Sequence, residues 1–259
     1  MSNVNFDELL LGAEKPSRYI GAEVNAVHKD QAEVRFLLAF PDTYEVGMSH
    51  LGLQILYSIL NEISYVAAER CFAVWPDRER QLRAGKLPLT SLESQTPLQD
   101  FDLIGFSLQY ELSYTNMLNM LDLGNIPLAH KERKAEHPLI IAGGPCCFNP
   151  APLVNFIDAF VIGEGEEVVE EITAAIREGK KKSLSRNNLI EQLAKISGIY
   201  VPAVHENHEV IKKRTVSDLN LWKHPLKPVV PLMQTIHDRI TLEIARGCTR
   251  GCRFCQAGM

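Results

Sequence analysis

From about residue 32, the chain alternates short apolar runs with amphipathic stretches, and this alternation limits the possible folds more than any other feature. It is typical of βαβ units, in which parallel strands form a sheet and helices cover its faces. The apolar runs that we expect to be strands span residues 34–40, 66–75, 101–108, 138–142 and 159–162. The sequence therefore predicts a mainly parallel sheet of about five strands.

Helical spacing separates these runs. Apolar residues recur every three or four positions over residues 51–63 and 168–176, which indicates helices that pack against the sheet. Shorter helices are expected over residues 77–84, 116–123 and 189–196. The predicted fold class is therefore α/β, a doubly wound sheet of flavodoxin or Rossmann type. In such a sheet, ligands bind in the crevice at the carboxyl ends of the strands.

The same patterns divide the chain into four segments. They are an N-terminal arm, the α/β domain, a connecting region and the start of a second domain: residues 1–31, 32–180, 181–236 and 237–259. In the connecting region we expect a hairpin over residues 198–214 and an extended linker over residues 221–231, which contain three prolines. The second domain is expected to begin with a strand over residues 239–245.

Composition and charge exclude several classes of protein. Lys and Arg number 27 against 32 Asp and Glu, so the formal net charge is −5 and no general positive field attracts nucleic acid. The apolar runs are far shorter than the ~20 residues that span a bilayer. Residues 1–8 lack the cationic start and apolar stretch of a signal peptide. We therefore expect a cytoplasmic protein with no membrane partner, whose six cysteines are reduced and available for metal or redox chemistry.

Three of the cysteines lie close together near the end of the sequence. Cys248, Cys252 and Cys255 follow the last expected strand with C-x3-C-x2-C spacing. Thiolates bind iron–sulfur clusters, Zn or Cu(I), and a loop this short loses little entropy when its thiolates converge. A structural zinc ion would need a fourth ligand, for which His237 is a candidate. Three thiolates on an iron–sulfur cluster would instead leave one iron open.

The residues around these cysteines support a compact metal-binding loop. Gly247 and Gly251 let the backbone turn tightly. Arg246, Arg250 and Arg253 are expected to offset the negative charge of the thiolates. The pattern therefore favours a metal centre over a chance cluster of cysteines.

The C-x3-C-x-Phe-C stretch, placed directly after an expected strand, resembles the cluster loop of radical S-adenosylmethionine (radical SAM) enzymes. The resemblance implies that Cys248, Cys252 and Cys255 hold a [4Fe–4S] cluster, whose fourth iron binds the amino and carboxylate groups of SAM. It also implies that Phe254 lies against the SAM adenine. The implied reaction is reductive cleavage of SAM to a 5′-deoxyadenosyl radical, with a reductant such as flavodoxin or ferredoxin as partner. No catalytic residue is assigned.

Residues 158–167 resemble the last strand and turn of the cobalamin-binding-type domains that precede radical SAM barrels. Ser107, after the third expected strand, and Gly143 and Gly144, after the fourth, lie where such domains place residues near the corrin or its nucleotide tail. Glu164 is assigned to the same site. The resemblance implies cobalamin as a candidate cofactor and methyl transfer to an unactivated carbon as the reaction. Without cobalamin, it implies a domain that positions a protein or RNA substrate.

The chain departs from the cobalamin pattern in one respect. No histidine lies in an Asp-x-His-x-x-Gly context, which is the context of a histidine ligand to cobalt. His50 has Met48 two residues before it, so we expect His50 to cap or line the first loop. Cobalamin would then bind without a histidine ligand. In addition, Glu164, Glu166 and Glu167 precede an expected helix and would repel phosphate, so their turn is not expected to bind it.

Residues 15–21 and 40–48 look closest to an uncharacterised bacterial subfamily in which this pair of domains is often fused to a further radical-SAM-linked domain. A complete barrel needs ~250 residues, whereas residues 237–259 supply one strand and its loop. The chain therefore resembles the N-terminal portion of such an enzyme, with a truncated barrel, and is expected to be inactive by itself. The alternatives are a non-catalytic flavodoxin-like binding module and a zinc-binding protein.

Two further groups of residues lie near the same edge of the expected sheet. Asp42, Tyr44 and Glu45 form a polar cluster that is equally consistent with structural caps and with ligand contacts. Cys146 and Cys147 are adjacent, so their side chains diverge and are poor joint ligands for one metal. We expect this pair to pack within its loop, with a redox role as the alternative.

Overall fold

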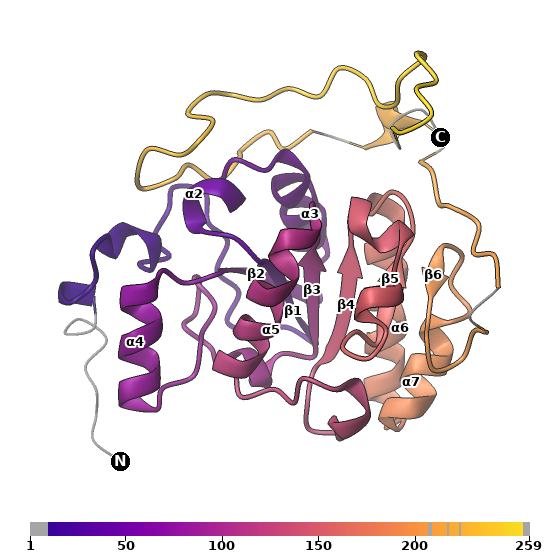
Figure 1. Ribbon diagram of the computed structural model, residues 1–259, viewed down its shortest axis with the longest axis horizontal. Helices are drawn as coiled ribbons and strands as arrows, with labels where there is room; N and C mark the ends of the chain where they lie inside the picture. Colours follow the sequence, from indigo (N-terminus) through magenta and orange to yellow (C-terminus); the bar gives the residue numbers. More distant parts are fainter. Residues whose placement is uncertain (1–9, 207–208, 217, 223, 256–259) are drawn as a thin grey trace.

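The structure is a computed structural model that describes residues 10–206, 209–216, 218–222 and 224–255. These residues form one six-stranded sheet with helices on both faces (Figure 1). The strands are β1 Val34–Phe40, β2 Val66–Phe72, β3 Leu103–Ser107, β4 Leu139–Gly143, β5 Ala159–Val161 and β6 Ile199–Tyr200. Strands β1 to β5 are parallel, and β6 runs antiparallel to β5. The predicted α/β class and the five predicted strands are confirmed.

The helices follow the predicted spacing. The α-helices are α2 Tyr44–Gly47, α3 Leu51–Glu62, α4 Pro76–Gly85, α5 Tyr114–Leu123, α6 Glu166–Lys181 and α7 Arg186–Leu193. The 3-10 helices are η1 Pro16–Arg18, η2 Leu98–Asp100, η3 Glu111–Ser113, η4 His130–Glu132, η5 Pro145–Phe148, η6 Ala151–Leu153 and η7 Leu219–Leu221. The helices predicted from apolar spacing are all present, with differences at their ends. Among the described residues, no helix is long and apolar enough to cross a membrane.

The strand order is β2-β1-β3-β4-β5-β6. The first five strands therefore have the 2-1-3-4-5 order of flavodoxin-like folds. Strand β1 pairs with β2 on one side and with β3 on the other. The direction in which strands are added to the sheet therefore reverses after β2. At such a switch point the loops diverge and leave a crevice beyond the carboxyl ends of the two strands.

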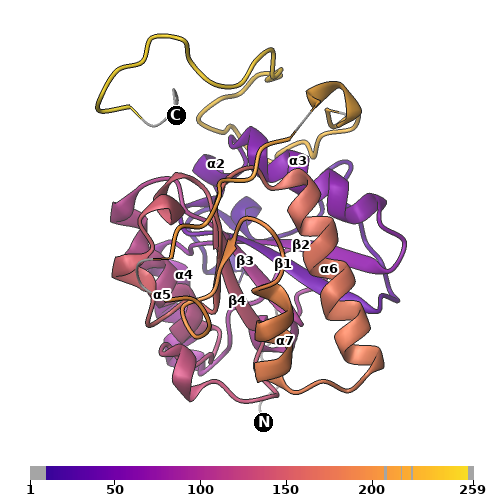
Figure 2. The same cartoon turned by 90° about the vertical axis from the view of Figure 1, so that its right-hand side faces the viewer.

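Two apolar cores lie on the two faces of the sheet. Successive side chains of a strand point to opposite faces, so Phe36 and Leu38 of β1 enter one core while Leu37 and Ala39 enter the other. The first core is completed by α3, α6 and α7, and the second by α4 and α5 (Figure 2). Because both faces are covered, the strands are apolar throughout, which is why they are visible in the sequence.

The described residues of the segment 198–214, which exclude 207 and 208, do not pair with one another as the expected hairpin would. Instead, β6 pairs with β5, with Tyr200 opposite Phe160 and Ile199 opposite Val161. Arg214 forms an isolated bridge with Gly163 beyond the end of β5. The edge of β5 offers unpaired N–H and C=O groups, which compete for the segment that would otherwise fold back on itself. The prediction of a hairpin considered only local pairing.

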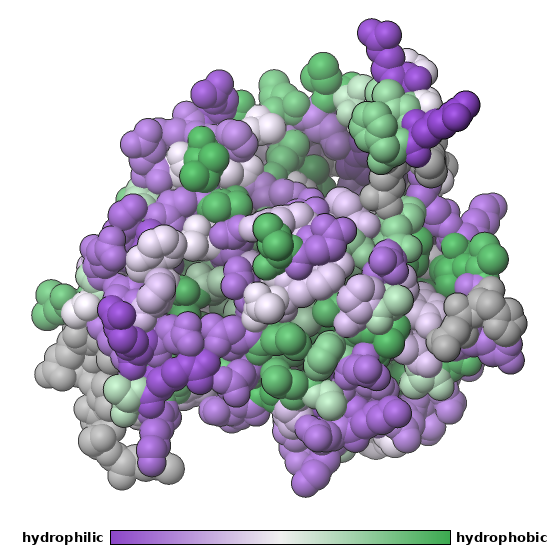
Figure 3. All heavy atoms as spheres, viewed as in Figure 1, coloured by the Kyte–Doolittle hydropathy of each residue, from purple (hydrophilic) through white to green (hydrophobic). Residues whose placement is uncertain are grey.

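The strand expected over residues 239–245 is also absent. A strand needs a neighbour with which to exchange hydrogen bonds, and none of the described residues pairs with this segment. Its alternating apolar side chains Ile240, Leu242 and Ile244 are 85%, 68% and 95% exposed. Figure 3 shows apolar side chains along the top of the molecule, where Figure 1 places the C-terminal segment.

The predicted linker lies against the domain. Val230 forms an isolated antiparallel bridge with Val24 of the N-terminal arm. Val229 is buried, and its N–H donates a hydrogen bond to Oε1 of Gln54 in α3 at 3.2 Å. The linker is therefore held between the arm and α3, which determines where the following residues begin.

Arg70 of β2 forms a buried ionic network. Its Nη2 lies 3.0 Å from Glu23 of the arm and its Nε lies 2.6 Å from Glu93, and all three side chains are at most 1% exposed. The hydroxyl of Tyr44 donates to Oε1 of Glu23 at 3.0 Å, and the N–H of Leu232 donates to that hydroxyl oxygen at 3.2 Å. The network thus connects β2 to the arm, to α2 and to Leu232, the residue directly after the linker.

Candidate functional site at the carboxyl edge of the sheet

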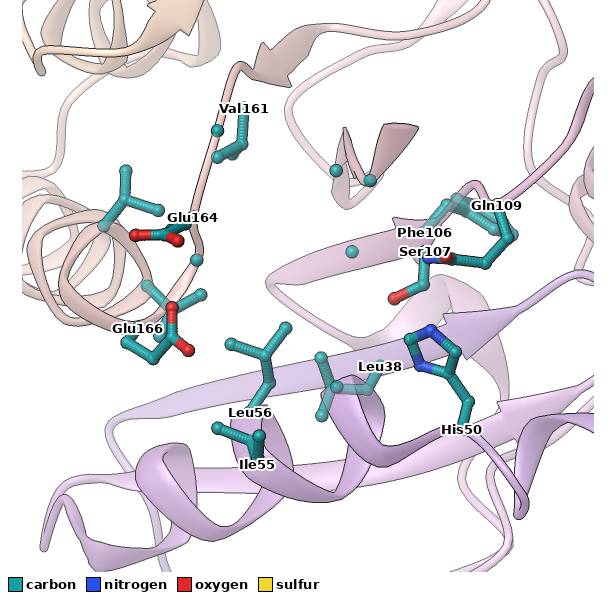
Figure 4. A pocket seen from close by; sticks show the side chains of 18 of the residues that line it. Leu38, His50, Ile55, Leu56, Phe106, Ser107, Gln109, Val161, Glu164 and Glu166 are labelled. Atoms are coloured by element: carbon teal, nitrogen blue, oxygen red, sulfur yellow. The ribbon is translucent and has the colours of Figure 1, made fainter. Parts of the chain in front are cut away.

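A cavity of about 560 Å³ opens at the carboxyl edge of the sheet, between α3 and α6 (Figure 4). Apolar side chains of β1, β4, β5, α3 and α6 form its floor and walls: Phe36, Leu38, Ile141, Val161, Ile55, Leu56, Val168 and Val169. This volume lies in the range of small-molecule pockets, ~300–1,000 Å³. An apolar body with a few polar groups at one end would match the lining.

The structure brings together all four residues predicted to contact a cofactor other than SAM. Ser107, Gly143, Gly144 and Glu164 line this cavity. They follow or end β3, β4 and β5, whose carboxyl ends meet at one edge of the parallel sheet. Their convergence is a structural finding, whereas the ligand they contact stays a prediction.

Gly144 has a conformation that other residues avoid. Its φ is +103°, and a Cβ at this position would lie 2.6 Å from the backbone oxygen of Leu108. Only glycine therefore lets the loop after β4 approach the loop after β3 this closely. This approach forms the side of the cavity that contains Ser107.

His50 caps helix α3, as the sequence led us to expect. Its Nδ1 accepts a hydrogen bond from the N–H of Leu53 at 3.2 Å. Burial holds the pKa of His50 below its usual value, although a hydrogen bond with Gln109 opposes this effect. A neutral imidazole that accepts at Nδ1 carries its proton on Nε2. Nδ1 of His50 is thus engaged in the helix cap, while the imidazole ring lines the rim of the cavity.

Three carboxylates and one arginine lie at the rim. Nη1 of Arg246 lies 3.4 Å from Glu164, Nη2 contacts Glu166, and Nε lies 2.7 Å from Glu243. Figure 4 shows Glu164 and Glu166 on the side of the cavity opposite His50. We expected Arg246 to offset thiolate charge, but the structure pairs it with these carboxylates. Those ion pairs hold the pKa of Arg246 above its usual value.

The described structure does not bring the three clustered cysteines together. Cys248 and Cys252 are exposed and Cys255 is half-buried. No group of three His, Cys, Asp or Glu side chains is placed to hold a metal ion in the part of the chain that the structure describes. Within the described residues, His237 does not join the cysteines either. Phe254 is 94% exposed and does not line the cavity.

The backbone of the cysteine loop has the tight turns that the sequence predicts. Gly247 has a φ of +83° and Gly251 a φ of +61°, both in the left-handed region that favours glycine. The N–H of Cys255 donates to the backbone oxygen of Cys252 at 3.0 Å, which closes one turn. The backbone therefore forms a closed turn between Cys252 and Cys255, the second and third cysteines of the loop.

The polar cluster after β1 makes structural contacts. Tyr44 is 1% exposed and joins the Arg70 network. Glu45 accepts from Nη2 of Arg18 at 2.7 Å. Asp42 accepts from the hydroxyl of Tyr110 at 2.9 Å. The sequence left two interpretations of this polar cluster open. The structure favours structural contacts within the protein over contacts to a ligand.

The adjacent cysteines after β4 pack within the domain. Cys146 and Cys147 are 7% and 0% exposed. Burial raises the pKa of both thiols above the usual value. A redox-active thiol generally has a lowered pKa and an accessible sulfur, so the structure favours packing over the redox alternative.

Comparison with known proteins identifies a family for this chain. A sequence model of the N-terminal region of radical SAM proteins matches residues 52–202, more than half of the chain. The chain belongs to this family. The matched part of this radical SAM N-terminal region begins in α3 and contains β2 to β6, so it includes most of the cavity.

One curated relative is similar over a longer part of the chain. An uncharacterised protein of Methanocaldococcus jannaschii is 24% identical over 225 residues, which cover 85% of this chain and 40% of the relative. The chain thus spans about two fifths of the length of that relative. No solved structure matches the chain.

The ion pairs that hold the rim of this radical SAM N-terminal region were not predicted from its sequence. We expected Glu166 only to repel phosphate, and Arg246 only to be a partner of the thiolates. The structure shows that they contact each other across 80 positions of sequence. The available signal was the opposite charge of two segments: residues 164–167, which we call the acidic turn and which lead from β5 into α6, and the arginine just before the cysteine loop.

Proposed function

We propose that this chain is the N-terminal part of a cytoplasmic radical SAM enzyme. In this proposal Cys248, Cys252 and Cys255 hold a [4Fe–4S] cluster and Phe254 lies against the SAM adenine. Membership of the family of radical SAM N-terminal regions supports it, as does the C-x3-C-x-Phe-C motif. The motif lies outside the matched residues 52–202 and is therefore an independent observation.

The donor set of the loop fits an iron–sulfur cluster. Three thiolates within eight residues, with glycine turns between them, supply soft ligands for three irons and leave a fourth iron for another ligand. When bound, such a cluster supplies the electron for reductive cleavage of SAM to methionine and a 5′-deoxyadenosyl radical. Cys248 and Cys252 are exposed, so both iron and SAM can reach the loop. A flavodoxin or ferredoxin is the proposed reductant.

Anaerobic reconstitution tests this proposal. We expect about four irons per chain after incubation with iron and sulfide, and a change in the cluster spectrum when SAM is added. The full-length protein should form 5′-deoxyadenosine with a reductant. If the reconstituted chain binds zinc but no iron, or if SAM leaves the cluster spectrum unchanged, the proposal is wrong. A non-catalytic flavodoxin-like module would then be the better interpretation.

We propose cobalamin as a second candidate ligand, because Ser107, Gly143, Gly144 and Glu164 line one cavity. The apolar slot between α3 and α6 fits the apolar part of such a group. The carboxylates at the rim would repel its phosphate, and the helix cap occupies Nδ1 of His50, which disfavours this histidine as a cobalt ligand. The chain's own residues would therefore bind and orient the corrin without contributing a ligand to the metal, and methyl transfer would be the associated reaction.

A titration with hydroxocobalamin, followed by absorbance, tests this second candidate. We expect saturable binding, and a spectrum that is the same for the wild-type chain and for His50→Ala. Leu56→Trp, which fills the slot, should weaken binding at least tenfold, while Leu112→Trp on the exposed surface serves as the matched control. No binding by the wild-type chain would reject cobalamin. The cavity would then be a place for substrate.

A further inference from the structure

Residues 237–246 form a strap, by which we mean the segment between the linker and the cysteine loop. The strap is anchored at its start near α2 and α3. The N–H of His237 donates to Oγ of Ser49 at 3.0 Å, and the N–H of Ile236 donates to the backbone oxygen of Glu45 at 3.4 Å. Figures 1 and 2 show the segment passing over the end of the molecule where α2 and α3 lie.

The other end of the strap is anchored at the start of α6. Arg246 contacts Glu164, which follows β5, and Glu166, the first residue of α6. The side chain of Glu166 is 6% exposed and that of Arg246 is 23% exposed. Charge pairs that are withdrawn from water interact more strongly than surface pairs. Glu243 lies 2.7 Å from Nε of Arg246 and orients the guanidinium from within the strap.

The acidic turn is a rigid partner for Arg246. The N–H of Glu164 donates to the backbone oxygen of Arg214 at 3.0 Å. Gly163 has a φ of +117°, and a Cβ there would lie 2.1 Å from the same oxygen of Arg214. The guanidinium of Arg214 lies 2.9 Å from Glu167, in the first turn of α6. These contacts hold the turn in place without any contribution from the strap.

Arg246 and Glu243 both line the cavity, so the docked strap forms part of its mouth. Cys248 follows Arg246 by two residues, which limits the distance between their Cα atoms to about 7 Å. We propose that Arg246 is a positioning residue that docks the cysteine loop on the acidic turn, so that a molecule in the cavity faces the cluster. This inference rests on the proposed function for the role of the loop, but the docking itself does not require the cluster.

Carbodiimide coupling of the chain without iron tests the docking directly. Arg246→Lys keeps the positive charge and introduces an amine, which a zero-length reagent joins to a carboxylate in contact with it. We expect mass spectrometry to find an amide between position 246 and Glu164 or Glu166. When the coupling is carried out in 1 M salt, less of this amide should form, because salt weakens the attraction that brings the lysine to the turn. Arg250→Lys, in the same loop, is the matched control and should not couple to the turn.

Loss of iron from the reconstituted chain tests the consequence for the loop. We expect Arg246→Gln and the double variant Glu164→Gln/Glu166→Gln each to assemble the cluster but to release iron to a chelator about tenfold faster. Combining all three substitutions should add little, because they remove one interaction. Glu178→Gln, at the far end of α6, should release iron at the wild-type rate.

The two proposals fail in different ways. If the introduced amine couples only to Glu243, or to no carboxylate, the docking is wrong whether or not a cluster assembles. Unchanged iron release in Arg246→Gln would also overturn it. If instead the amide forms but the wild-type chain binds no iron, the docking stands as a contact between strap and turn, while the proposed function and the role of the loop are rejected.

Discussion

Replacing Arg70 by methionine is expected to lower the free energy of unfolding by about 3–5 kcal/mol, the usual effect of removing one partner from a buried ion pair. Methionine has a similar length but leaves the carboxylates of Glu23 and Glu93 without a cation. Those two side chains are at most 1% exposed. Because Glu23 belongs to the arm, and Tyr44 links it to Leu232, directly after the linker, the loss should also loosen both segments.

Urea unfolding followed by circular dichroism measures this effect. Arg177→Met removes an arginine whose partner Glu33 lies at the surface and should change stability little. Adding Glu23→Gln and Glu93→Gln to Arg70→Met should recover part of the lost stability, because the uncompensated charges are then absent. A loss below about 1 kcal/mol for Arg70→Met would show that the network is not what holds the arm.

Replacement of any one of Cys248, Cys252 or Cys255 by alanine is expected to reduce the iron bound after reconstitution at least tenfold. A cluster held by three thiolates has no spare protein ligand, so each sulfur is needed. The fold should be unaffected, because these cysteines lie outside the two apolar cores. Iron analysis and visible absorbance measure the loss, and circular dichroism measures the fold.

Cys146→Ala is the matched control for this series, since it removes a cysteine that is buried away from the loop. It should keep the wild-type content of iron. Full iron content in all three loop variants would contradict the cluster assignment, and loss of iron in Cys146→Ala would place the cluster elsewhere.

The sheet and its helices could be predicted because their signals are local. Strand β1 is buried on both faces, so its residues are almost all apolar, and α6 repeats Val168, Ile172 and Ile176 on one face. The position of the cavity also followed from the sequence. Parallel strands end at one edge, so the residues after β3, β4 and β5 had to converge there.

Long-range contacts could not be predicted in this way. Arg70 lies 47 positions from Glu23, and Arg246 lies 80 positions from Glu166. No periodic pattern connects such pairs, and an arginine near cysteines was more simply assigned to the thiolates. The pairing of β6 with β5 was missed for a related reason, because an open sheet edge is a property of the folded domain and not of the segment that covers it.

The short strand β6 has a practical consequence for self-association. An uncovered edge of a parallel sheet is a template on which another molecule can add a strand. Here Ile199 and Tyr200 occupy that place, and Arg214 extends the cover beyond β5. Shorter versions of this domain that end before β6 would therefore be prone to aggregate, and versions intended for crystallisation should retain the sequence through Arg214.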